Sequence, residues 1–430
     1  MIEQLSQILP RTRHGLPITR WVPILAALTL VGCSTTNYVA PDIGLTKEPE
    51  AVPEARLLDI GLIEFDSGLP EGDDADVKDS IYPEIRRAEA RFFPYHLKST
   101  LQRTGHWGAV RVIPNDTVVA DVYVGGEVRH SDGNRVELTM FARDASGNRW
   151  FRRRYDTRTD SNDYSRNRER SADPYQNVFN EFANDLYEAF NELSDEEIAQ
   201  LRRTARMRFY ADMAPDIFGD YIETDKRGRV DVVRLPADND PMVSRLNAIR
   251  ERDALFLDTL NEHYANFYYG IALPYEDWRE ASREAELEYQ RLRRSALLRG
   301  LAGVALVAAS AEMPRPRGQD SGTTRRTKRA LSNYAMFSGF EAIASGFGRL
   351  AEARLQRQSI AELSDSFGRE AAPMTIAIEG QEQRLTGTAA SQYDQWRELL
   401  RKINQTETGL VDEPEIGING RTADGELNDG

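Results

Sequence analysis

The pattern of apolar and polar positions over residues 57–193 predicts a folded unit that mixes strands and helices. A short run rich in Leu and Ile at 57–65 predicts the first strand, and apolar residues at helical spacing over 81–103 predict a helix after it. Pro94 lies inside that helix. We expect it to kink or divide the helix, because proline lacks the N–H that an interior turn needs.

Alternating patterns and two tight turns predict a three-stranded meander after this helix. The turns are Ser-Asp-Gly-Asn at 131–134 and Ala-Ser-Gly-Asn at 145–148, whose Asp, Asn and Gly tolerate turn conformations. The expected strands and the helix that closes the unit occupy 109–113, 120–128, 135–143, 150–155 and 173–193.

Helical spacing dominates the next hundred residues. Ser194 and Glu197 have the spacing of a capping box at the start of a helix that runs to about residue 211, and 230–235 predicts a short strand. The stretch 242–299 predicts two helices of a bundle, interrupted at Gly270 and Pro274. The first of these is expected to turn inward Leu246, Ile249, Leu255, Leu260, Tyr264 and Phe267.

Two segments rich in small residues follow, at 300–311 and 331–350, with a basic loop at 313–329 between them. Small residues allow two helices to approach closely, so we expect a packed hairpin inside the helical domain. A membrane-inserted or oligomer-forming hairpin is the alternative. Twelve uncharged residues make about 18 Å of helix, which is short for a hydrocarbon core of about 30 Å.

The C-terminal patterns complete an α+β fold class: a small mixed α/β domain with an antiparallel meander, then a helical domain with a β-hairpin and a helix. The hairpin is expected at 373–387 and the amphipathic helix at 392–405. The predicted divisions are 1–32 signal peptide, 33–56 tether, 57–193 α/β domain, 194–299 helical domain, 300–367 small-residue hairpin, 368–410 β-hairpin plus helix and 411–430 disordered acidic tail.

Charge at the N-terminus indicates export. Arg11, Arg13 and Arg20 precede a short apolar run at 21–31 and the only cysteine, Cys33, which is the order of parts in a secretory signal. A transmembrane anchor is the weaker alternative, because a spanning helix needs about 20 apolar residues.

The sequence Leu30-Val31-Gly32-Cys33 resembles the lipobox of bacterial lipoproteins. That resemblance implies lipidation of Cys33 and attachment to a membrane of a Gram-negative envelope. Ser34, where an aspartate would signal retention, implies the periplasmic face of the outer membrane rather than the inner membrane.

Residues 57–193 also resemble periplasmic lipoprotein modules. The segments are Val110–Val112, the Ala-Asp-Val-Tyr-Val-Gly-Gly-Glu-Val run at 120–128 and the Asp-Ala-Ser-Gly-Asn-Arg-Trp run at 144–150. Similar arrangements occur in the N-terminal domain of the Tol-system propeller, the curli-secretion lipoprotein and the auxiliary lipoproteins of lipid-exporting ABC transporters. The resemblance implies an envelope component and carries over no site residue.

The net charge of the chain limits the classes of molecule that it is expected to bind. The chain has 55 basic and 69 acidic side chains, a formal charge of −14, which argues against nucleic acid as a partner. One cluster of basic residues is a candidate patch for binding anions. It consists of Arg149, Arg152, Arg153, Arg154 and Arg158. Arginine forks suit lipid phosphate or peptidoglycan, but Asp156, Asp160 and other acids are interleaved, so a self-neutralising surface is the main expectation.

Catalytic and metal signatures are weak. His96, His106, His130 and His263 have no metal-binding spacing, and the acidic loop Asp73, Asp74, Asp76, Asp79 lacks the spacing of a calcium hand. We expect no metal, no cofactor and no catalytic residue.

The function we expect is therefore a non-catalytic scaffold or accessory component that faces the periplasm and contacts an envelope protein or a second copy. A cell-wall enzyme that uses carboxylates, or an oligomeric pore-like subunit, are the alternatives.

Overall fold

A computed structural model describes residues 42–47, 52–69, 82–160, 163–164, 173–311, 361–362, 374–378 and 381–408. The predicted signal peptide, Cys33, the acidic loop at 73–79, the basic loop at 313–329, the second small-residue segment and the acidic tail lie outside these residues.

A five-stranded mixed sheet forms the centre of the fold and, with the helices, confirms the α+β class. Its spatial order is β2-β1-β3-β4-β5, with β1 parallel to both neighbours and β3, β4 and β5 antiparallel. The strands are β1 Ile60–Ile63, β2 Val110–Ile113, β3 Val122–Ser131, β4 Arg135–Asp144 and β5 Arg149–Arg158. The predicted meander is therefore present, and the first strand lies inside the sheet between β2 and β3.

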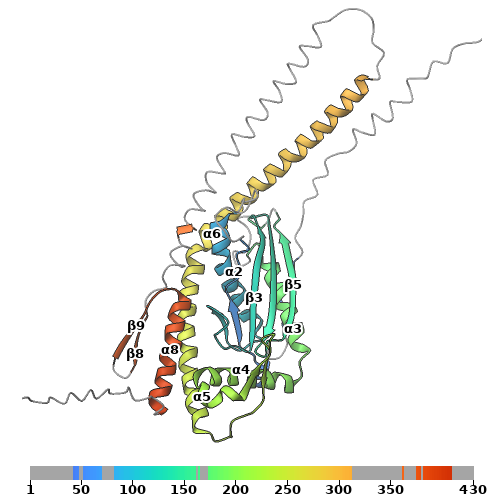
Figure 1. The fold of residues 1–430 in the computed structure, drawn as a ribbon. Coiled ribbons are helices and arrows are strands. Elements are labelled where there is room, and N and C mark those ends of the chain that lie inside the picture. Colours follow the sequence, from blue (N-terminus) through green and yellow to red (C-terminus); the bar gives the residue numbers. More distant parts are fainter. Residues whose placement is uncertain are drawn as a thin grey trace, which may run out of the picture. The chain divides into compact units, whose positions relative to one another are not determined.

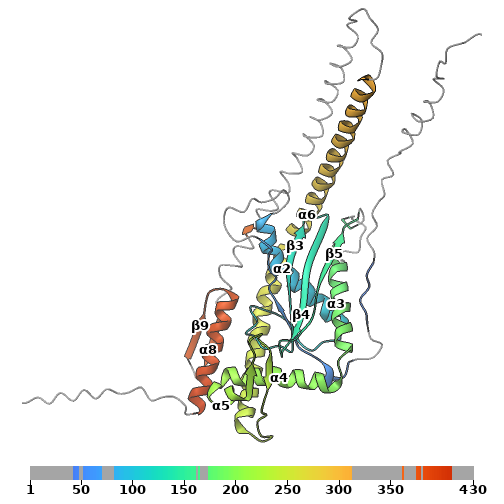
Figure 2. The same cartoon turned by 45° about the vertical axis from the view of Figure 1, so that its right-hand side comes forward.

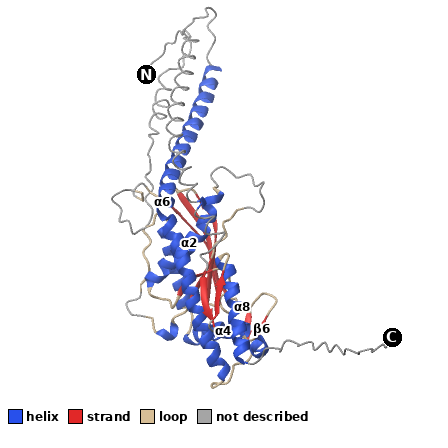
Figure 3. Cartoon of the chain, turned by 90° about the vertical axis from the view of Figure 1, so that its left-hand side faces the viewer, coloured by secondary structure: helices blue, strands red, loops and turns tan. Residues whose placement is uncertain are grey.

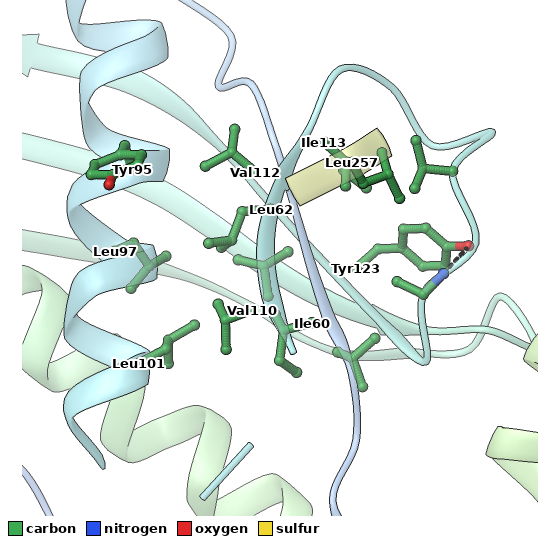
Figure 4. Close-up of a cluster of buried hydrophobic side chains, with 14 of the residues drawn as sticks. Ile60, Leu62, Tyr95, Leu97, Leu101, Val110, Val112, Ile113, Tyr123 and Leu257 are labelled. Atoms are coloured by element: carbon green, nitrogen blue, oxygen red, sulfur yellow. Dashed lines mark hydrogen bonds between the residues drawn. The ribbon is translucent and has the colours of Figure 1, made fainter. Parts of the chain in front are cut away.

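Two helices cover one face of this sheet, α2 (Pro83–Thr104) and α3 (Gln176–Asn191) (Figures 1 and 2). Figure 4 shows Leu97 and Leu101 of α2 directed at Leu62 and Val110 of the parallel strands. Burial of these side chains removes apolar surface from water, which is the main stabilising contribution to such a layer.

Pro94 does not divide α2, so the expected split is absent and the proline lies within one continuous helix. The proline is buried, and α2 packs against the sheet and also against the long helix α6 (Figure 3). An interior proline costs about 3 kcal/mol, which packing on two sides outweighs.

Both hairpin turns have the local chemistry that their sequences predict. Asp132 accepts hydrogen bonds from the N–H groups of Asn134 (2.9 Å) and Arg135 (2.7 Å), and Gly133 has φ +80°. Asp144 accepts in the same way from Ser146 in the second turn.

After α3 the chain forms α4 (Asp195–Met213), a short α5 (Pro215–Phe218) and a two-stranded sheet of β6 (Ile222–Thr224) and β7 (Val230–Val232). The capping box at the start of α4 is confirmed, since Ser194 and Glu197 each bond the other's main chain. The strand expected at 230–235 is shorter. Its partner β6 was not predicted, because three residues are too few to carry an alternating pattern.

The largest departure from expectation is α6, a single helix at Pro241–Ala311. The predicted interruption at Gly270 and Pro274 is wrong, and the same helix continues through residue 299 into the first small-residue segment. Leu255 is also 68% exposed rather than inward, because the buried stripe of this helix passes through its neighbours Phe256 and Leu257.

The C-terminal hairpin and helix are present as β8 (Met374–Ile378), β9 (Gln381–Leu385) and α8 (Ala389–Thr408). The helix packs on α6 through Trp396, whose ring stacks on Phe256 with centroids 4.9 Å apart. Among the helices of the described residues, none has the length and apolar content needed to cross a membrane.

Candidate functional site

The predicted arginine patch lies on β5, an edge strand of the five-stranded sheet, and all five of its side chains are exposed. Side chains alternate between the two faces of a strand. Arg152 and Arg154 therefore project on the face opposite α2 and α3, whereas Arg153 projects on the helical side, where it meets Asp185 of α3.

Three of the five arginines pair with carboxylates from other elements. Arg152 lies 3.5 Å from Glu127 on β3 and Arg154 lies 3.2 Å from Glu137 on β4. On the other face, Arg153 lies 2.9 Å from Asp185.

The neutralisation is therefore tertiary and does not come from the interleaved acids. Asp156 pairs instead with Arg135 of β4 (3.4 Å), and Asp160 bonds main-chain groups of its own loop. Within the described ranges, Arg149 and Arg158 have no carboxylate at ion-pair distance. Counted over both faces of β5, the patch offers two guanidinium groups without an ion pair among the described residues and three weakly held surface pairs, so we expect it to bind anions only weakly.

A second cluster of charged side chains lies buried between α2, α6 and the β3–β4 hairpin. Glu89 of α2 is fully buried and accepts hydrogen bonds from Tyr275 of α6 (2.6 Å) and from Ser131 of β3. Burial raises the pKa of Glu89, although Arg86 and the two hydroxyl donors oppose that shift.

Arg279 of α6 forms the other half of this buried centre. Its guanidinium makes two hydrogen bonds of 2.9 Å to Asp173 and lies over the ring of Tyr275, 4.3 Å from the centroid. Burial alone would raise the pKa of Asp173, but Arg279 lowers it to about 2. The pair is ionised and bidentate, the geometry in which arginine is most directional.

Arg86 ties the same centre to an irregularity of the sheet. The pairing of β3 with β4 shifts register between Val128 and His130, and Arg86 donates to the carbonyls of Val128 (2.7 Å) and Arg129 (3.3 Å). A bulge leaves main-chain groups without hydrogen-bond partners in the ladder. Here the Arg86 guanidinium is the partner of two such carbonyl groups.

The turn at Gly133 brings α6 close to the hairpin. A Cβ at Gly133 would lie 2.3 Å from the carbonyl oxygen of Arg279, so only glycine fits there. Ser282 and Arg283 of α6 add hydrogen bonds to Asp132 O (2.9 Å) and Thr159 Oγ1 (3.0 Å). The buried charges therefore hold α6 in place and are closed to a substrate.

The sequence analysis missed this buried centre, although a signal was present. Arg86 and Glu89 stand three residues apart on the same side of α2 as Ile85 and Ala88, so charged side chains fall within the apolar stripe. A charge in such a position is buried only with partners, which predicts a polar network without saying where the partners come from.

None of the histidines among the described residues belongs to a group that could hold a metal ion. His96 is buried, accepts a hydrogen bond from Tyr268 at Nδ1 (2.8 Å) and donates from Nε2 to Gln176 (3.0 Å). Burial lowers the pKa of His96, so the imidazole is neutral. Over the ranges that the structure describes, no three His, Cys, Asp or Glu side chains gather closely enough to hold a metal ion.

An open depression of about 530 Å³ lies along α3, lined by Thr46, Asn184, Asp185, Tyr187, Glu188, Asn191 and Glu192. Its lining residues are polar or acidic by type, although apolar atoms supply much of the exposed surface, and Thr46 of the extended segment 42–47 is one of them.

No protein-family model, curated protein or solved structure matches this chain. The roles of its residues therefore rest on geometry and chemistry.

Proposed function

We propose that this protein is a scaffold or assembly component of a bacterial envelope, anchored to the outer membrane by lipid on Cys33 and facing the periplasm. The support for the anchor is the charged, apolar and small-residue order of residues 11–33 that ends in Leu30-Val31-Gly32-Cys33. Two or more acyl chains hold a soluble body stably at a membrane.

The observation that carries the scaffold role is the continuity of α6. Its 71 residues make a rod of about 105 Å at 1.5 Å per residue. Among the described side chains, those of Ser282 and Arg283 make the last contacts of α6 with the sheet region. Figure 1 shows the helix continuing beyond the strands from there.

The far end of α6 has the composition of a helix contact. Residues 300–311 carry no charge and are mostly Gly, Ala, Val and Leu. Small side chains let another helix approach closely and pack by van der Waals contact. A rod fixed to the body at one end and apolar at the other fits a component that reaches an envelope protein or a second copy.

Two measurements test this function together. Metabolic labelling with a fatty acid is expected to mark the protein and to be lost in Cys33→Ala. Photocrosslinking groups at Val304 and Leu306 are expected to capture an envelope protein or a second copy of the 48.7 kDa chain in intact cells.

Glu251, an exposed residue of the first half of α6, is the control position and is expected to capture nothing. Fatty-acid label that persists in Cys33→Ala would contradict lipidation of Cys33. Equal capture at Glu251 and Val304 would contradict a binding role for the far end of α6. A closed ring of many copies in native mass measurements would favour a pore-like subunit instead.

A further inference from the structure

A row of asparagines on α3 holds the extended segment 42–47. Asn177 accepts from the N–H of Ile43 (3.1 Å), and Asn180 donates to the carbonyl of the same residue (2.6 Å). Asn184 does both, accepting from the N–H of Thr46 (2.8 Å) and donating to the carbonyl of Gly44 (2.9 Å). The blue segment beside α3 in Figure 2 is this part of the chain.

The spacing explains how one helix holds an extended chain. Positions 177, 180 and 184 are separated by three and four residues and so lie on one side of the helix. A side-chain carboxamide carries one acceptor and two donors, which match the N–H and C=O of a peptide group. All four hydrogen bonds go to the main chain of residues 42–47.

The row ends at Asn184. Asn191 lies seven residues later on the same side of α3, and both residues line the open depression described above. Thr46 also lines that depression. None of the four hydrogen bonds to segment 42–47 involves Asn191, so Asn191 lies outside the row.

We propose that the asparagine row of α3 is a binding site for extended polypeptide main chain, and that its resident ligand is the protein's own segment 42–47. The asparagines bond only peptide groups of the segment, and the side chain of Leu45 packs against the core beside them. It joins the N-terminal part of the chain to the folded body at a defined place.

This site has a consequence for anchoring, which rests on the proposed lipidation of Cys33. Nine residues from Cys33 to Asp42 span at most about 30 Å. If the segment is released, the next described residue that packs against the core is Val52, and a span counted to that residue has a limit of about 65 Å. The asparagine row would thus halve the distance that α3 can move from the membrane.

Asn184→Ala in the full chain tests the site, with Asn191→Ala as the matched control on the same side of the helix. Loss of two hydrogen bonds should speed amide exchange at Thr46, and tryptic cleavage after the exposed Lys47, roughly tenfold. The control should leave both rates unchanged, and far-UV circular dichroism should show both variants folded. Unchanged rates in Asn184→Ala would overturn the site.

A second pair of variants tests whether the main chain is what binds. Thr46→Pro removes the main-chain N–H that donates to Asn184. Thr46→Ala keeps that N–H and changes only an exposed side chain. Release is expected in the proline variant alone. Equal release in both variants would show recognition of the side chain and overturn the proposal.

Energy transfer on vesicles separates the site from the anchor. With Cys33 acylated, Glu192→Cys supplies a single labelling position in the depression beside α3, and a fluorescent lipid serves as acceptor. Asn184→Ala is expected to lower transfer, and Asn191→Ala is not. Unchanged transfer on acylated protein would contradict the claim that the asparagine row limits the distance between α3 and the membrane. Absence of acylation would contradict the proposed function, and the amide-exchange and cleavage tests of the site would still apply.

Discussion

The carboxamide of Asn261 on α6 makes both main-chain hydrogen bonds of Val112 on β2. Its Oδ1 accepts from the Val112 N–H (2.9 Å) and its Nδ2 donates to the Val112 carbonyl (3.0 Å). Strand β2 is at the edge of the sheet, where unpaired main-chain groups invite pairing with another chain. A single side chain therefore takes the place of a neighbouring strand.

We expect Asn261→Leu to lower the free energy of unfolding by about 2–3 kcal/mol, because it leaves two buried main-chain groups without partners. Urea unfolding at neutral pH measures the loss. The matched control is Asp258→Ala, one turn earlier on α6, which removes a half-exposed ion pair with Arg111 (2.6 Å). That control should cost no more than about 1 kcal/mol, and equal losses in the two variants would contradict the role of Asn261.

The buried pair of Arg279 and Asp173 should be far more sensitive than the surface pairs. Arg279→Met leaves the Asp173 carboxylate buried without its partner, which typically costs about 3–5 kcal/mol. Arg153→Met breaks the exposed pair with Asp185 and should cost no more than about 1 kcal/mol.

The same pair predicts a pH dependence. Because the pKa of Asp173 is depressed to about 2 in the folded protein, its stabilising contribution is present above the unfolded value of about 3.9 and is lost as pH falls toward 2. The difference in unfolding free energy between the protein and Arg279→Met should therefore shrink from pH 7 to pH 3. A difference that stays constant with pH would argue against the ionised pair.

Asp253 of α6 should have the opposite pH dependence. Burial raises its pKa to about 6, although Tyr393 and Trp396 of α8 donate to it. The folded protein keeps a proton that the unfolded chain has released between about pH 4 and 6, so stability falls as pH rises through that window. A pKa that differs by about two between the folded and unfolded states corresponds to about 2.7 kcal/mol.

Asp253→Asn removes this titration. Relative to the unchanged protein, we expect the variant to gain about 2–3 kcal/mol between pH 4 and pH 7.5 in urea unfolding. Burial also raises the pKa of Asp121 to about 6, and its effect cancels because both proteins contain it. A gain that does not change with pH would place the titrating group elsewhere.

The face of β5 that carries Arg152 and Arg154, called the arginine face below, should bind anions only when the carboxylates paired with these two arginines are neutralised. In a Cys33→Ala background, Glu127→Gln combined with Glu137→Gln frees Arg152 and Arg154. Sedimentation with anionic vesicles should rise at low salt and fall at high salt, as screening predicts.

The control for this measurement changes the net charge equally at other exposed ion pairs. Glu196→Gln combined with Asp225→Asn releases Arg203 and Arg229, which lie away from the sheet face. Equal sedimentation of the two double variants would mean that net charge, rather than the arginine face, governs binding.

The local sequence pattern was sufficient to predict an element of structure wherever the interactions that form the element involve only a few neighbouring residues. The capping box of Ser194 and Glu197, the turn at Gly133 and the apolar spacing of α2 and α3 all involve residues within one or two turns of each other. Propensity and hydrogen-bonding capacity act at that range, so the elements of the sheet region were predictable to within a few residues.

Tertiary contacts decided what local pattern could not. Pro274 and Gly270 are weak points of an isolated helix, yet α6 continues through them, since its buried face packs on α2, the sheet and α8.

The sequence by itself determined the order of strands and helices in the five-stranded sheet region and the N-terminal signal pattern with its single cysteine. Only the tertiary structure decided that Asn261 completes an edge strand, that Arg279 meets Asp173 and that Asn184 holds residues 44 and 46. Each of these contacts joins residues more than one hundred positions apart. Their free energy comes from the burial and close placement of polar groups, which no periodicity in the chain encodes.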